Sequence, residues 1–91
     1  MTEDFLKHTL AKLGSAIRSL RQNLGISQEE LAHRSGLHRT YITDIERGAR
    51  NVTMESVTKL ARALNVPLSA LFAKVDADPS DPTDEASPPN P

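Results

Sequence analysis

Side chains that can read the edges of base pairs occur together between positions 39 and 44, as Arg39, Thr40, Thr43 and Asp44. A guanidinium can donate two hydrogen bonds to O6 and N7 of guanine, and a carboxylate can accept one from the amino group of cytosine. A threonine presents a hydroxyl to a base or phosphate and a methyl group to thymine. A helix carrying this set on its outer face would be suited to the major groove of DNA. Asp44 has a second interpretation, in which it holds Arg39 in place.

A second set of side chains around this segment is suited to contacting a phosphate backbone. Gln28 is predicted at the start of a helix, where free N–H groups and the helix dipole favour an anion. His38 stands where a helix cap is usually Ser, Thr or Asp, so it is either a weaker cap or a direct DNA contact. The Tyr41 hydroxyl can reach a sugar-phosphate. The candidate backbone contacts are Gln28, His38, Tyr41, Arg47, Arg50 and Asn51. A merely solvated polar face is the alternative for the side chains between positions 39 and 44.

Hydrophobic periodicity predicts that helices position these side chains. Apolar residues spaced four and three apart from Leu6 to Leu24 form the stripe of an amphipathic helix, which begins within residues 3–12 and ends at Gly25. Further helices are predicted over residues 28–35, 39–47, 54–64 and 68–75. In the helix over residues 39–47, Ile42 and Ile45 face inward, which directs the polar set outward. The sequence has no alternating strand pattern, so the predicted fold class is all-α.

Helix boundaries are marked by residues with known capping roles. Ser27 and Glu30 match a capping box, in which the serine accepts from the Glu30 N–H and the glutamate reaches back. Gly36 suits a left-handed turn after the second helix, and Thr53 is a good N-cap for the fourth. Gly14 is expected to weaken the middle of the first helix. A short helix, a glycine turn and a second helix together describe a helix-turn-helix.

The positions of Gln28, Ala32, Gly36, Ile42 and Ile45 resemble those of the lambda-repressor/Cro-like (XRE) DNA-binding domains. The similarity spans roughly residues 10–73 and implies a five-helix domain whose third helix enters the major groove. It also implies a phosphate contact for Gln28. For Glu46, which phosphate would repel, it implies a structural ion pair with Arg21.

Residues 39–51 are similar to restriction–modification controller proteins, and the same string occurs in other regulators of the family. The resemblance implies a sequence-specific transcription regulator that binds double-stranded DNA as a homodimer. Its palindromic operator would have half-sites roughly one helical turn apart. Apolar residues near the C-terminal helix are the expected source of the dimer interface, although some must also close the core. They are Val66, Leu68, Leu71 and Phe72.

Charge divides the chain into two parts. The whole chain has 91 residues and a formal net charge of −1, but residues 76–91 contain five acidic residues, five prolines and no Lys or Arg. Residues 1–75 therefore carry a net charge of +4. We expect a DNA-binding domain over residues 1–75 and a disordered acidic tail over residues 76–91. The tail is either a solubilising terminus or a competitor for the basic surface.

Several functional classes are disfavoured by composition. The chain has no cysteine, no apolar run long enough to span a bilayer and an acidic N-terminus, which together indicate a cytoplasmic protein. No cofactor loop, metal-ligand set or nucleophile–base pair is visible, so we expect neither an enzyme nor a cofactor. The alternative function is a protein-interaction module, such as an antitoxin or adaptor that also binds DNA. The lack of large apolar anchors in the tail weighs against it.

Overall fold

The computed structural model describes residues 3–77, which form five α-helices and no strand. The helices are α1 (Glu3–Asn23), α2 (Gln28–Ser35), α3 (Arg39–Glu46), α4 (Met54–Ala63) and α5 (Leu68–Asp76). The predicted all-α class is confirmed, and α1 begins at the early end of its expected range. Within the described range, no helix is both long and apolar enough to cross a membrane. The expected disordered tail lies outside the described residues, apart from its first two positions.

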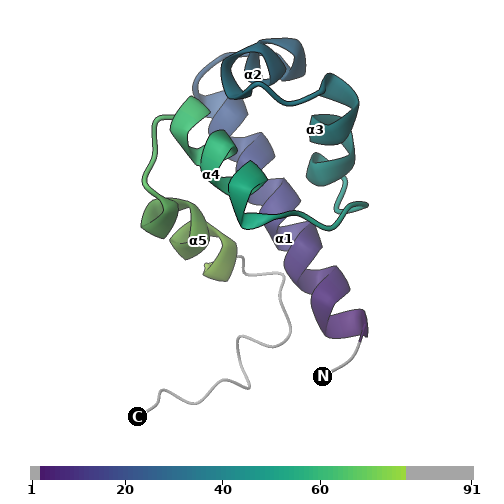
Figure 1. Cartoon of the computed structure of the whole chain (residues 1–91). Coiled ribbons are helices and arrows are strands. Elements are labelled where there is room, and N and C mark those ends of the chain that lie inside the picture. Colours follow the sequence, from purple (N-terminus) through teal and green to yellow (C-terminus); the bar gives the residue numbers. More distant parts are fainter. Residues whose placement is uncertain (1–2, 78–91) are drawn as a thin grey trace.

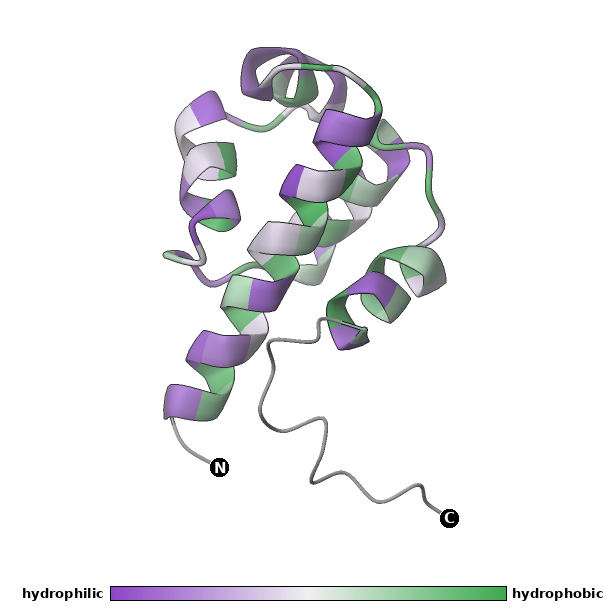
Figure 2. Ribbon diagram, turned by 180° about the vertical axis from the view of Figure 1, so that it is seen from behind, coloured by the Kyte–Doolittle hydropathy of each residue, from purple (hydrophilic) through white to green (hydrophobic). Residues whose placement is uncertain are grey.

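The long helix α1 is the element around which the others are arranged (Figure 1). It packs against α3 and α5, while α2 packs against α3 and α4. Each helix carries both hydrophobic and hydrophilic residues (Figure 2), as expected for helices that cover a shared core. Every helix contributes to that core, which includes Ile17, Leu31, Ile42, Leu60 and Leu71, each fully buried.

Gly14 lies at a close approach of the backbones of α1 and α3. A Cβ atom at this position would collide with the backbone oxygen of Ile45 and would lie 2.7 Å from the backbone oxygen of Glu46. The expectation that Gly14 weakens α1 therefore misses its main role, because the helix continues through it without interruption. The absence of a side chain allows the C-terminal end of α3 to rest directly on α1.

The apolar stripe of α1 is buried only in its middle. Leu13 and Ile17 belong to the core, but Leu6 and Leu24 at the two ends of the stripe are 46% and 42% exposed. The predicted apolar stripe is therefore exposed to solvent at these two ends. The first turns of α1 extend beyond the other helices (Figure 1), so no neighbouring helix covers them on all sides.

The predicted caps are present with one exception. The Ser27 hydroxyl accepts from the Glu30 N–H at 3.0 Å, and Thr53 forms a reciprocal capping box with Ser56. The Glu30 carboxylate instead accepts from Arg34 Nε at 2.8 Å, one turn further along α2. This ion pair lowers the pKa of Glu30 below its usual value. The predicted return contact from Glu30 to residue 27 is therefore replaced by an ion pair on the surface.

Candidate nucleic-acid interface

The turn between α2 and α3 is held by local hydrogen bonds. Gly36 has φ of +77°, in the left-handed region that favours glycine, and its N–H donates to the Ala32 carbonyl at 2.9 Å. The buried Ser35 hydroxyl donates to the same carbonyl at 3.4 Å and accepts from the Leu37 N–H at 3.3 Å. These contacts set the direction in which α3 leaves the turn.

Helix α3 presents a polar face on the side opposite its buried residues. Ile42 and Ile45 are 0% and 2% exposed, while Arg39 and Thr40 at the start of the helix are exposed. Thr43, one turn after Thr40, is half-buried. This arrangement places the start of α3 where its side chains can enter a groove, as a recognition helix requires.

A buried polar network joins α1, α2 and α3. Arg21 donates to both carboxylate oxygens of Glu46, from Nε at 2.7 Å and from Nη2 at 3.1 Å. The hydrogen bond to Glu46 is the largest cause of a raised pKa for Arg21. Arg21 Nη1 also donates to the Ile26 carbonyl at 2.9 Å, which ties the α1–α2 connection to the pair. The Arg21 and Glu46 side chains are 12% and 3% exposed, so this is a structural ion pair.

Gln28 extends the same network towards the polar face of α3. Its side-chain amide donates to Glu46 Oε1 at 3.0 Å, and its oxygen accepts from the Thr43 hydroxyl at 2.9 Å. The side chain of Gln28 is thus oriented from two sides at the first residue of α2. A phosphate at this helix start would meet the free N–H groups of α2 beside an amide already fixed in place.

The loop after α3 is held against the helix through Arg50. Its guanidinium lies 5.0 Å from the centre of the Tyr41 ring, and its Nη2 is 3.1 Å from Asp44 Oδ2. The Tyr41 hydroxyl is 3.0 Å from the hydroxyl of the buried Ser56. The Tyr41 hydroxyl would therefore have to give up its hydrogen bond to Ser56 in order to contact a sugar-phosphate. Arg47 Nη1 lies 3.9 Å from the other Asp44 oxygen.

The remaining candidates lie at the two ends of α3. His38 is the N-cap residue but its side chain makes no capping hydrogen bond, as the interpretation of a weaker cap requires. Asn51 is exposed in the loop that follows Arg50. Asp44 pairs with Arg47 and Arg50, which lie beyond the end of the helix, and not with Arg39 as its second interpretation required.

The apolar residues expected at a dimer interface divide between core and surface. Leu71 is fully buried within the protomer, which corrects its assignment to the interface. Together with Val75, one turn later, it forms the inner face of α5. Val66 and Leu68 pack partly against the core, whereas Phe72 is 38% exposed. Of the four, Phe72 has the side chain most available to a second copy.

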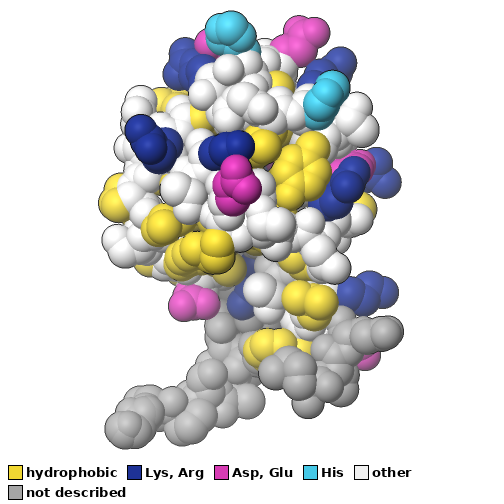
Figure 3. Space-filling model, viewed as in Figure 1, with side chains coloured by type: hydrophobic (Ala, Val, Ile, Leu, Met, Phe, Trp, Pro, Cys, Tyr) yellow, Lys and Arg dark blue, Asp and Glu magenta, His cyan; other side chains and the backbone are white. Residues whose placement is uncertain are grey.

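An apolar groove beside Phe72 was not expected from the sequence. Its cavity of about 310 Å³ lies between α1, α4 and α5 and is lined by Leu6, Leu10, Met54 and Phe72, among others. Met54 is 59% exposed, and Phe5 nearby on α1 is 44% exposed. Figure 3 shows hydrophobic side chains gathered over α5 and again towards the start of α1. The exposure of Leu6 and its place in this groove follow from the path of α1 and could not be read from the sequence.

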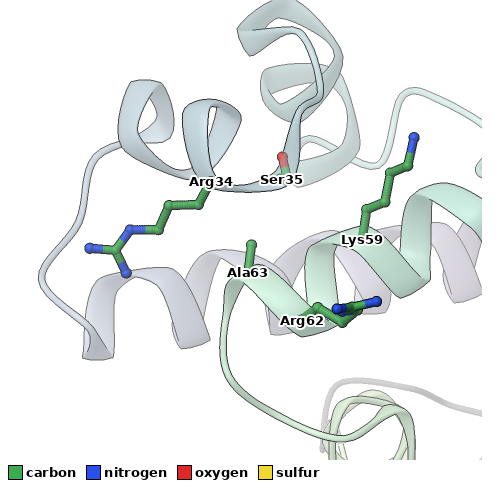
Figure 4. A pocket seen from close by; sticks show the side chains of 5 residues that line it. All are labelled: Arg34, Ser35, Lys59, Arg62 and Ala63. Carbon is green, nitrogen blue, oxygen red and sulfur yellow. The ribbon is translucent and has the colours of Figure 1, made fainter.

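A second basic cluster lies away from the start of α3, between the C-terminal end of α2 and α4. Arg34, Lys59 and Arg62 border a cavity of about 390 Å³. Their charged groups extend in different directions (Figure 4), and two of them are paired, Arg34 with Glu30 and Lys59 with Glu55. The charged groups of this cluster do not converge on a single point.

Comparison with known proteins agrees with this geometry. A helix-turn-helix family model matches residues 17–71. The control protein C.SmaI of Serratia marcescens is 47% identical over 62 residues, which cover 68% of this chain and 74% of the relative.

Solved structures extend the similarity to three dimensions. The restriction–modification controller protein C.AhdI of Aeromonas hydrophila matches with a TM-score of 0.68 and 48% identity, covering 69% of this chain and 96% of that one. The controller protein C.Esp1396I, solved as a tetramer with its natural 35 base-pair operator, matches with a TM-score of 0.70 and 37% identity. That match covers 74% of this chain and 88% of the other. The chain belongs to the helix-turn-helix (XRE-type) family of DNA-binding transcription regulators.

Proposed function

We propose that this protein is a restriction–modification controller, a dimeric regulator that binds a palindromic operator through α3. The observation that carries the proposal is the exposed start of α3, on a helix whose C-terminal half is fixed by the Arg21–Glu46–Gln28 network. Similarity to C.SmaI and C.AhdI over most of their lengths supports the controller type within the family.

Base recognition is assigned to the outer face of α3. Arg39 and Thr40 are exposed at its N-terminal end, which is the part of a recognition helix that meets base edges. Thr43 lies one turn further along the same face, whereas Asp44 is paired with Arg50 and Arg47. Arg39 is the best candidate for a bidentate contact to guanine.

Backbone contacts are assigned to the residues around this face. Gln28 at the start of α2 and the loop residues Arg50 and Asn51 flank α3 on two sides. His38, Tyr41 and Arg47 complete the set at either end of the helix. Such contacts fix the register of the protein on the duplex without reading its sequence.

Dimerisation is assigned to the apolar surface that includes Phe72 and the groove beside it. A two-fold interface at this surface would remove four exposed apolar side chains from contact with water, those of Phe5, Leu6, Met54 and Phe72. Sedimentation of the full chain tests this assignment. We expect a dimer at tens of micromolar and a shift towards monomer in Phe72→Ser, and a strict monomer with and without operator would contradict it.

The DNA-binding assignment is tested on duplexes that the wild-type protein enriches from a random pool. Arg39→Ala is expected to cost about 1–3 kcal/mol on the enriched duplex and to relax the base preference there. Arg50→Ala should weaken binding to enriched and scrambled duplexes alike. If Arg39→Ala leaves both affinities unchanged, α3 is not the recognition helix.

A further inference from the structure

The Asp44 carboxylate is an unexpected feature for a surface that binds phosphate. It lies on α3 and is 26% exposed, between two arginines that are both candidates for contacting the DNA backbone. Arg50 is 3.1 Å away and Arg47 is 3.9 Å away. A carboxylate on a DNA-binding face repels the polyanion unless it accepts a hydrogen bond from a base.

Arg50 is held by two contacts of different kinds. Asp44 provides the opposite charge, and the Tyr41 ring provides a surface on which the guanidinium lies at 5.0 Å. The ring is itself anchored, since its hydroxyl meets the buried Ser56. Arg50 remains 48% exposed, so its pair with Asp44 is accessible to water and to a competing phosphate.

We propose that Asp44 is a specificity-determining residue that restrains sequence-independent binding, because it occupies Arg50, and less closely Arg47, until a phosphate replaces it. This inference rests on the proposed function and describes how the availability of its phosphate-binding arginines is controlled. Every duplex offers phosphates, so the cost of displacing Asp44 applies to every sequence. Binding then depends more heavily on the base contacts of Arg39 and Thr40, which only a correct site provides.

The test substitutes Asp44→Asn, which keeps the size of the side chain and removes its charge. Affinity for a scrambled duplex should rise by roughly threefold to tenfold, and the plot of log K against log salt should steepen by about one. Affinity for the enriched operator should rise less, which lowers the ratio between the two. If Asp44 instead reads a base, the substitution lowers operator affinity and leaves the scrambled duplex unchanged, and this result would overturn the proposal.

A matched control separates this effect from a simple change of net charge. Glu55→Gln also removes one acidic charge and also releases a paired cation, Lys59, whose pair is 3.1 Å long. Lys59 lies in the basic cluster between α2 and α4 (Figure 4), and Arg50 is not among the residues that line that cavity. An equal gain in affinity from Glu55→Gln would refute a specific role for Asp44.

The double variant identifies the cation through which Asp44 acts. In the Asp44→Asn background, Arg50→Ala should remove most of the gain, so its cost there should exceed its cost in the wild-type protein. Equal costs in both backgrounds would contradict the proposal.

Elution from a heparin column provides a readout without DNA, and the Asp44→Asn variant should elute at higher salt than the Glu55→Gln variant. If no duplex is bound, the proposed function fails, while the heparin comparison still decides whether Asp44 restrains Arg50.

Discussion

Helix α3 carries two carboxylates, Glu46 and Asp44, that pair with arginines from other parts of the chain and have different surroundings. Glu46 faces inward and meets Arg21 through two hydrogen bonds, with the two side chains 3% and 12% exposed. Asp44, two residues earlier, faces outward and meets Arg50 through one contact, with the side chains 26% and 48% exposed. The first pair lies under the helix, and the second lies at the edge of the proposed DNA-binding face.

The difference shows how burial decides what an ion pair can do. Removing one member of a buried pair leaves an uncompensated charge, so the Glu46 pair is costly to break and holds α3 in position. An exposed pair contributes little to stability and exchanges readily with another ion. The Asp44 pair can therefore give way to phosphate, at a cost well below that of breaking the Glu46 pair.

The largest expected effect comes from breaking the buried pair. Glu46→Ala should lower the free energy of unfolding by about 3 kcal/mol, because Arg21 and Gln28 both lose their acceptor. Urea denaturation followed by circular dichroism measures the change. Asp44→Asn is the comparison variant and should change stability by less than about 1 kcal/mol. Similar losses in the two variants would remove the distinction between the pairs.

A second substitution tests the close packing beneath the buried pair. Gly14→Ala would place a methyl group against the backbone oxygens of Ile45 and Glu46. The expected net loss is about 1–3 kcal/mol, despite the better helix propensity of alanine. Ser15→Ala, at an exposed position of the same helix, is the control and should be neutral or slightly stabilising. Equal stability of the two variants in thermal unfolding would show that α3 does not rest on Gly14.

The smallest effect is expected for an exposed pair outside the recognition helix. Arg34 lowers the pKa of Glu30 in the folded protein, so this carboxylate contributes stability above its usual pKa of 4.5. The contribution is lost as the pH falls through the lowered value. Glu30→Gln should therefore be slightly less stable than wild type near pH 7, and the difference should vanish in acid. A difference that persists well below pH 4.5 would point to another cause.

Local patterns in the sequence predicted most of the fold. Periodicity and caps placed all the helices over residues 3–77, because both depend on residues close together in the chain. The exposure of Leu6 and the burial of Leu71 depend on which helices meet across the core, which one sequence does not specify. The same holds for Gly14, whose neighbour on α3 is some thirty residues away.

The candidate site was predictable in its residues and less so in its connections. Helical geometry placed Arg39 and Thr40 on the outer face of α3, and family resemblance paired Arg21 with Glu46. The contact between Asp44 and Arg50 depends on the path of the loop after α3, which has no regular periodicity to reveal it. Side-chain pairings between a helix and the loop that follows it are therefore the feature of the site that only the structure reveals.

The central claim, that this chain is a dimeric and sequence-specific DNA-binding protein, is tested most directly by selection from a random duplex pool. The wild-type protein should enrich a palindrome whose half-sites lie roughly one helical turn apart. Arg39→Ala should fail to enrich the same sequence under identical salt. A pool that remains random after repeated selection, or an enriched sequence without two-fold symmetry, would contradict the account.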